Sequence, residues 1–211
     1  ARQQVGGGFG LTVVGRVPLT ESTAVVLLSL CNITCNPKIE RISRSCMEWL
    51  KQNRNDDRGW GPIKSMPSRT HATALAILAL TASNLSVDDK AFLKESVQWL
   101  REARNQDGGW GEMPRDNRST PFHSSISQLA LRRCGQTDNE PAITDARAWL
   151  DKCWDRRLMW DTGVVPANLS ERYDLSRPQG KFGRAIWYHF ASAWVLLTLL
   201  EDENEAIDKR M

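Results

Sequence analysis

Residues 99–111 read WLREARNQDGGWG, and this stretch decides the fold of the chain. Its two tryptophans, Trp99 and Trp110, each have counterparts 50 residues earlier and 50 residues later. Six of the nine tryptophans therefore follow one period, which is typical of repeated supersecondary units. They are Trp49, Trp60, Trp99, Trp110, Trp149 and Trp160.

The glycine-rich loop before the second tryptophan recurs as well. Arg58-Gly59-Trp60-Gly61 matches Gly108–Gly111, and Gly7-Gly8-Phe9-Gly10 is an earlier copy with phenylalanine. Glycine allows a positive-φ reversal, after which the indole covers the end of the preceding helix. We therefore interpret the six tryptophans and Gly109 as structural, the alternative being platforms for a ligand. The arginine at 54 and 104 is expected to bond free carbonyls at the end of its own helix.

Two kinds of helix alternate along the repeat. The TALAILAL-type segments are apolar nearly all round and predict buried inner helices near 22–31, 70–83, 121–134 and 184–200. The segments that end in Trp-Leu carry one apolar stripe and predict outer helices near 38–53, 88–104 and 140–154. Ser86, Asn36 before Pro37, and Thr120 before Pro121 predict N-caps, and Gly135 predicts a left-handed helix stop.

Composition excludes several classes of protein. The 211 residues are 41% hydrophobic and 25% charged, with a net charge of +3, which is ordinary for a globular domain. The positive charge is spread out, so nucleic-acid binding is not expected. The longest apolar stretches, 72–81 and 191–200, are about half a membrane span, so no transmembrane segment is expected. Five cysteines without zinc-type spacing predict reduced thiols, and we expect a cytoplasmic protein.

The spacing of 99–111 resembles the QW repeat of squalene–hopene cyclases, which occurs in looser form in protein prenyltransferase β subunits. There an aromatic–aliphatic pair is followed by Gln and then by Gly-x-Trp. This sequence departs from the pattern at Arg54, Arg58 and Arg156. The resemblance implies an all-α α/α toroid, in which inner and outer helices surround an apolar cavity. We expect one partial toroid domain over 1–211, with an incomplete ring and an insertion loop at about 162–183.

The chemistry of these families is incomplete in this chain. The D-x-D-D motif, whose middle Asp protonates the substrate of class II terpene cyclases, is absent, as is the D-D-x-x-D magnesium motif. Of the prenyltransferase zinc ligands only the histidine has a match, at His189. Ser124 and Ser125 stand where Asp and Cys are needed, and the pair Asp151 and Cys153 falls on an outer helix. We therefore expect no catalytic residue, metal or cofactor in this chain.

The three histidines fall near the starts of inner helices, which ring one mouth of a toroid. They could converge there on a ligand, or each could hydrogen-bond its own helix start. The long insertion is either a binding element or a plain surface loop. The candidate binding residues are His71, His123, Trp187, Tyr188, His189, Arg172, Tyr173 and Arg177.

These observations favour a non-catalytic recognition module. It would bind a protein partner or an apolar, isoprenoid-like ligand on its inner-helix side. Because the chain begins inside a repeat, we expect a fragment whose ring is completed by a partner or by the remainder of a parent chain. The enzyme alternative is a partial subunit of a class II terpene cyclase or protein prenyltransferase with its catalytic residues elsewhere. A third alternative is a purely structural fragment.

Overall fold

The computed structural model describes residues 3–4, 6–10, 17–31, 33, 36–83, 86–116, 118–137, 139–153 and 193–198. Regular structure in this part of the chain is helical, apart from one isolated bridge between Gln3 and Phe9. The helices are α1 (Thr20–Leu30), α2 (Pro37–Gln52), α3 (Thr70–Thr81), α4 (Val87–Glu102), α5 (Pro121–Arg133) and α6 (Pro141–Cys153). Residues 193–198 are also helical.

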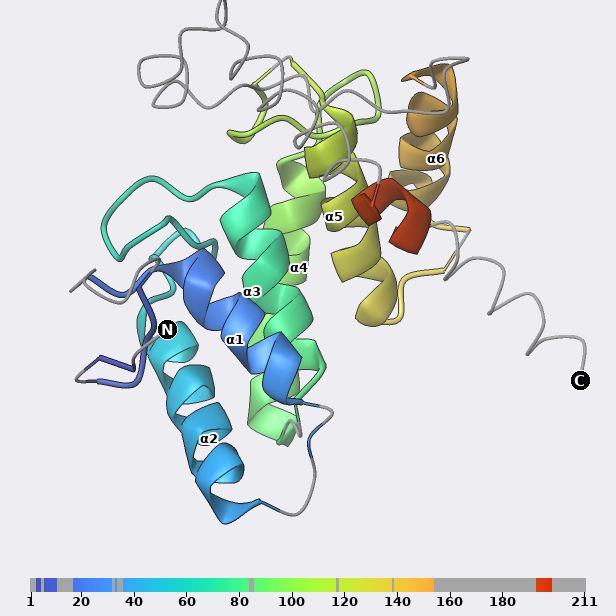
Figure 1. The fold of residues 1–211 in the computed structure, drawn as a ribbon. Coiled ribbons are helices and arrows are strands. Elements are labelled where there is room, and N and C mark those ends of the chain that lie inside the picture. Colours follow the sequence, from blue (N-terminus) through green and yellow to red (C-terminus); the bar gives the residue numbers. More distant parts are fainter. Residues whose placement is uncertain are drawn as a thin grey trace, which may run out of the picture.

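The helices form an array of αα-hairpins, as the sequence predicts. Figure 1 shows α1, α3 and α5 side by side through the middle of the molecule. α1 packs on α3 and α3 packs on α5, whereas α2, α4 and α6 each pack on the inner helix of their own hairpin. The predicted division into inner and outer helices is confirmed, and the predicted bounds of α1 to α6 agree within a few residues. Of the inner helix predicted over 184–200, only the helical residues 193–198 lie within the described part of the chain. Residues 162–183 lie outside the described part of the chain.

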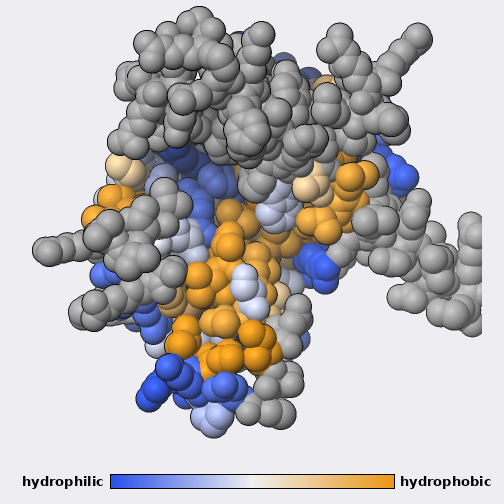
Figure 2. All heavy atoms as spheres, viewed as in Figure 1, coloured by the Kyte–Doolittle hydropathy of each residue, from blue (hydrophilic) through white to orange (hydrophobic). Residues whose placement is uncertain are grey.

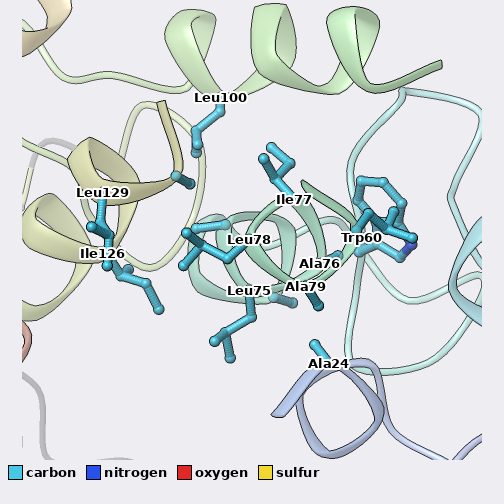
Figure 3. Close-up of a cluster of buried hydrophobic side chains, with 14 of the residues drawn as sticks. Ala24, Trp60, Leu75, Ala76, Ile77, Leu78, Ala79, Leu100, Ile126 and Leu129 are labelled. Carbon is cyan, nitrogen blue, oxygen red and sulfur yellow. The ribbon is translucent and has the colours of Figure 1, made fainter. Parts of the chain in front are cut away.

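The centre of the core is α3, whose residues from Ala72 to Leu80 are all buried. In Figure 3, Ala24 of α1 lies below this helix, while Leu78 lies on the side of Ile126 and Leu129 of α5. Leu100 reaches the same core from α4. A helix that is apolar all round is stable only when neighbours cover every face, and the two flanking inner helices and α4 do so here.

Of the two other inner helices, α1 departs from the prediction of full burial, whereas α5 confirms it without the apolar sequence expected of a buried helix. α1 leaves Val25 48% exposed, so one of its faces has no covering helix among the described residues. α5 is buried although its sequence is polar, and Ser124, Ser127 and Gln128 are all inaccessible. The apolar pattern alone therefore predicts the position of an inner helix better than its exposure.

The predicted helix ends are confirmed. The Asn36 side chain accepts hydrogen bonds at the start of α2, Thr120 does so for α5, and Ser86 forms a complete capping box with Asp89. Gly135 adopts φ 82° after α5. The N–H groups of Gly135 and Gln136 bond the Arg132 and Leu131 carbonyls, which is the Schellman arrangement.

The second tryptophan of each described repeat caps the C-terminal end of the preceding outer helix. The Trp60 indole donates from Nε1 to the Leu50 carbonyl at 2.8 Å, and Trp110 makes the same bond to Leu100 at 2.8 Å. Both indoles are fully buried. Each thus donates to a carbonyl in the last turn of its outer helix and fills the space next to that helix end.

The same loops are tied to the inner helices through one position of the repeat. The backbone N–H of Trp60 donates to Thr73 Oγ1, and that of Trp110 donates to Ser124 Oγ, both at 2.9 Å. Phe9, in the earliest copy, donates to Thr23 at 2.9 Å. The Ser or Thr that opens each apolar segment is therefore a buried acceptor that fixes the loop to the next helix.

A carboxylate in each loop joins one repeat to the next. Asp107 accepts from the Gly109 N–H, from Ser119 Oγ at 2.6 Å and from Trp149 Nε1 at 2.9 Å. Asp57 makes the equivalent bonds, including one from Trp99 Nε1 at 3.2 Å. The first tryptophan of one outer helix is thereby hydrogen-bonded to the loop of the preceding repeat.

The expectation for the loop arginines is wrong. Only the backbone N–H groups of Arg54 and Arg104 bond the end of their own helix, whereas their side chains reach the next outer helix. Arg54 Nη1 donates to the Phe92 carbonyl at 2.8 Å, with its guanidinium carbon 3.6 Å from the centroid of that ring. Arg104 Nη1 donates to the Pro141 carbonyl at 2.8 Å. The indoles already occupy the helix ends, so the longer guanidinium side chain extends across to the following repeat.

Arg58 occupies the glycine position of its loop, with φ 75°, where Gly108 has φ 95° in the next copy. A left-handed conformation costs a non-glycine residue about 1–2 kcal/mol. Glycine avoids this cost, but it loses more conformational entropy on folding, which offsets part of the gain. We expect Arg58→Gly to raise the free energy of unfolding by about 0.5–1 kcal/mol. Urea denaturation would measure it, and a decrease would contradict the assignment of strain.

Candidate ligand-binding site at the inner-helix mouth

The first turns of α1, α3 and α5 lie at one end of the inner layer. Glu21, His71 and Phe122 occupy equivalent positions there, each two residues before the Ser or Thr that holds the loop. At this end, backbone hydrogen bonds connect each inner helix to the loop of the following repeat. The Thr20 N–H donates to the Pro62 carbonyl, and the Thr70 N–H donates to the Glu112 carbonyl. The repeat thus brings a carboxyl, an imidazole and a phenyl group to the same rim.

Two of the three histidines come together at this mouth, with an aromatic ring beside them. The ring centroids of His71 and His123 are 6.2 Å apart and nearly perpendicular. Phe122 lies 5.5 Å from His71 and 5.0 Å from His123, between centroids. These edge-on distances are typical of favourable aromatic contacts, so the three rings form one cluster.

His123 is hydrogen-bonded to the start of its own helix. Thr120 Oγ1 accepts the backbone N–H of His123 at 3.2 Å and lies 2.8 Å from its Nδ1, within hydrogen-bond distance. His123 therefore makes the helix-start hydrogen bond that the sequence allowed as an alternative.

Both imidazoles are held neutral. Desolvation by burial, with a smaller contribution from the Arg69 charge, lowers the pKa of His71 to about 4. Burial lowers the pKa of His123 to about 3, with a smaller contribution from His71. Neutral imidazoles can donate and accept hydrogen bonds, but neither ring can act as a general acid at pH 7. The aromatic cluster therefore carries no charge near neutrality.

These pKa shifts predict an acid-sensitive fold. In the unfolded chain the histidines bind protons below about 6.5, whereas in the folded chain they do so only near their lowered pKa values of about 4 and about 3. Stability should therefore decline as the pH falls from about 6.5 toward 4. We expect His71→Gln to flatten that decline in urea denaturation between pH 7 and pH 4. An unchanged pH dependence would contradict the burial of a neutral imidazole.

A charged rim surrounds the rings. Arg69 Nη1 contacts Glu112 Oε1 at 2.6 Å, across from α3 to the following loop. Desolvation raises the pKa of Glu21, although its own backbone hydrogen bond and the Arg69 charge counteract this. Glu21 Oε2 is buried without a hydrogen-bond partner among the described residues. Sequence reasoning missed Glu21, which lacks any acidic neighbour, and only its repeat equivalence to His71 could have drawn attention to it.

Most of the other predicted site residues cannot be placed. Trp187, Tyr188, His189, Arg172, Tyr173 and Arg177, and the repeat residue Trp160, lie outside the described residues. Asp151 and Cys153 lie on α6, an outer helix, as expected.

Within the described ranges, no group of three His, Cys, Asp or Glu residues could hold a metal ion. No described helix has the length and apolar character needed to cross a membrane.

The inner-helix side below the mouth is apolar. Figure 2 views this side and shows a hydrophobic area over α1 and its neighbours, with hydrophilic residues at its lower end. Val25 of α1 is 48% exposed, and Leu196 and Leu197 of the 193–198 helix are 51% and 49% exposed. Thr198 Oγ1 bonds the Ser125 carbonyl at 3.1 Å, so the 193–198 helix contacts α5. Exposed apolar groups in such number on one side are typical of a binding surface.

The fold is similar to that of a known enzyme. No protein-family model and no curated protein matches the chain. Among solved structures, ent-copalyl diphosphate synthase from Streptomyces platensis matches with a TM-score of 0.55 and 22% sequence identity. The match covers 71% of this chain and 30% of the synthase. At this identity the likeness establishes a terpene cyclase-like helical fold, and the chain spans less than a third of that enzyme.

Proposed function

We propose that this chain is a non-catalytic section of a terpene cyclase-like toroid that binds an apolar, isoprenoid-like ligand on its inner-helix side. The observation that carries the proposal is the exposed apolar side of α1 and the 193–198 helix. An apolar ligand covering this surface would gain roughly 25 cal/mol for each Å² removed from water. The uncharged rings of His71, Phe122 and His123 fit the same chemistry, because they avoid burying a charge against hydrocarbon.

The absence of the cyclase and prenyltransferase motifs from the sequence supports a binding role over a catalytic one. Neutral histidines with a low pKa supply no proton to an alkene at pH 7. On this proposal the ring is completed by a protein partner or by further repeats. The open face of α1 supports completion of the ring by further protein, because this inner helix packs on α3 but leaves Val25 exposed.

A second candidate is the partial catalytic subunit, and Glu21 favours it. A buried carboxyl with a raised pKa retains its proton longer than an exposed one and has an unpartnered oxygen. If the chain turns over farnesyl or geranylgeranyl diphosphate, and Glu21→Gln removes that turnover, the non-catalytic proposal is rejected. No product from either substrate is the result that the binding role requires.

The binding role is tested with farnesol, a neutral isoprenoid, by isothermal titration calorimetry. Val25→Asp places a charge on the inner-helix side, and we expect it to weaken farnesol binding at least tenfold. Val87→Asp is the matched control, because Val87 is 82% exposed at the start of outer helix α4. Equal affinities for the two variants, or no binding by the unmodified chain, would overturn the proposal.

A further inference from the structure

The open face of α1 ends in a carboxyl group at the inner-helix mouth. Glu21 and Val25 lie four residues apart on α1, so they share one face of that helix. Val25 is 48% exposed, and Glu21 is partly exposed. A ligand that covers Val25 would therefore bring one of its ends to Glu21.

The neighbouring inner helix places an imidazole at the same level. His71 occupies the position on α3 that is equivalent to Glu21 on α1, and the two helices pack side by side. The His71 ring contacts Phe122 and His123 and remains partly exposed. Among the described residues, the His71 imidazole makes no hydrogen bond. A ligand end at the mouth thus meets a carboxyl group from α1 and an imidazole from α3.

These two side chains can hydrogen-bond a ligand in both directions. Glu21 Oε2 is shielded from water, and no described residue donates a hydrogen bond to it. Leaving such an oxygen unpaired is unfavourable, so a donor supplied by a ligand would stabilise it. A neutral imidazole offers one N–H donor and one acceptor nitrogen. The pair can therefore accept one hydrogen bond from a ligand and donate another to it.

The charges at the mouth restrict the polar end of the ligand, its head group. Glu21 forms no ion pair with a described residue, whereas Arg69 is already paired with Glu112 at 2.6 Å. Both imidazoles are neutral near pH 7. A phosphate or carboxylate head group would meet two acidic side chains and only one guanidinium, so it is disfavoured. A hydroxyl group has no charge and both donates and accepts a hydrogen bond.

We propose that the mouth binds the hydroxyl group of an isoprenoid alcohol whose hydrocarbon chain covers Val25. Glu21 accepts the hydroxyl proton, and His71 donates to the hydroxyl oxygen. The inference rests on the proposed function, which supplies the apolar ligand, and it adds the class of the head group and the two residues that select it. An isoprenoid diphosphate and an isoprenoid without a hydroxyl group are both poorer ligands.

The test compares farnesol with farnesyl methyl ether in calorimetric titrations at pH 7. The ether keeps the hydrocarbon chain and the acceptor oxygen but cannot donate to Glu21. We expect the unmodified chain to bind farnesol about tenfold more tightly than the ether. Glu21→Leu should bind the two ligands equally, and Glu21→Gln, which keeps the side-chain volume, should reduce the preference to about threefold.

Two further variants complete the design. The matched control is Glu40→Leu, which removes an exposed carboxyl group from outer helix α2 and should keep the tenfold preference. His71→Phe retains a ring beside Phe122 but removes the donor, so it should weaken both ligands by a similar factor. A partial loss of structure would weaken both ligands alike, so only a changed preference reports on the Glu21 contact.

The results separate this inference from the proposed function. Equal binding of farnesol and its methyl ether by the unmodified chain would overturn the inference and leave the proposed function standing. No binding of either ligand would reject both. Tighter binding of farnesyl diphosphate than of farnesol would overturn the inference, because the mouth would then prefer an anion. A tenfold preference that persists in Glu21→Leu, or an unchanged farnesol affinity in His71→Phe, would overturn the assignment of that residue.

Discussion

Replacing Trp110 with alanine is expected to lower the free energy of unfolding by about 4 kcal/mol. The indole is fully buried, so its removal leaves a cavity where α4, the loop and the inner helices meet. It also leaves the Leu100 carbonyl without the 2.8 Å bond from Nε1. Lost apolar burial and an unsatisfied carbonyl act in the same direction. Chemical denaturation followed by far-ultraviolet circular dichroism would measure the change.

Two further variants separate the components of that loss. Trp110→Phe keeps an aromatic ring but removes the donor, so we expect an intermediate loss of about 2 kcal/mol. Trp99→Phe acts on a partly exposed ring and should cost less than 1 kcal/mol. If Trp110→Ala cost less than Trp99→Phe, the assignment of Trp110 as the cap of α4 would be wrong.

Gly109→Ala is the second large effect, with an expected loss of about 2–3 kcal/mol. A Cβ at this position would lie 2.6 Å from Ser119 Cβ and 2.9 Å from Ser124 Oγ. Both serines hold the loop, since Ser119 donates to Asp107 and Ser124 accepts from the Trp110 N–H. The added methyl group must therefore displace the residues that fix the loop to α5. Thermal and urea unfolding of the variant would report the loss.

Gly135→Ala is the control for Gly109→Ala. Nothing lies within 4 Å of a Cβ at Gly135, so only its φ of 82° is unfavourable for alanine. We expect about 1 kcal/mol for this conformational cost alone. A loss at Gly109 no larger than that at Gly135 would mean that the close approach to the serines is not required for folding.

The helical repeat could be predicted from the sequence because it rests on local and periodic signals. The spacing of Trp60 and Trp110 gives the unit length, and the caps at Asn36, Ser86 and Thr120 act within a few residues of chain. Such signals do not depend on long-range contacts. The inner-helix prediction for α3 is confirmed for the same reason, because a segment that is apolar all round has no favourable exposed state.

The contacts between repeats could not be predicted, since they join residues about 40 positions apart. Asp107 appeared only as a loop residue before Trp110, yet its carboxylate accepts from Trp149. The sequence predicts the wrong helix for the side chains of Arg54 and Arg104, because it does not show that an indole already bonds the same helix end. Spacing shows that a residue recurs, whereas its partner depends on how adjacent hairpins pack.

Gln128 is a further departure from the pattern. Leu27 and Ile77 occupy the equivalent position in the two earlier inner helices, and both are fully buried. Gln128 is 1% exposed, and within the described part of the chain neither its amide nitrogen nor its amide oxygen has a hydrogen-bond partner. Burying an unpaired amide is unfavourable, and nothing in the described residues explains why it stands there.

For the candidate site, the sequence left open whether the histidines at the helix starts converge or each bond their own helix; His71 and His123 lie together, and His123 also bonds Thr120. It did not predict Phe122 beside them, the neutral state of both rings or the raised pKa of Glu21. These properties follow from desolvation and from neighbours on other helices, which only the assembled structure supplies. The apolar ligand remains a proposal resting on the exposed inner-helix side.

The joining of successive repeats through their tryptophans is tested most directly by a double-mutant cycle between Asp107 and Trp149. Asp107→Ala and Trp149→Phe each remove one side of the 2.9 Å bond from Trp149 Nε1 to Asp107 Oδ2. Measured by urea denaturation, the cycle should give a coupling energy of about 0.5–1 kcal/mol. Strict additivity of the two single losses would contradict a direct bond between the repeats.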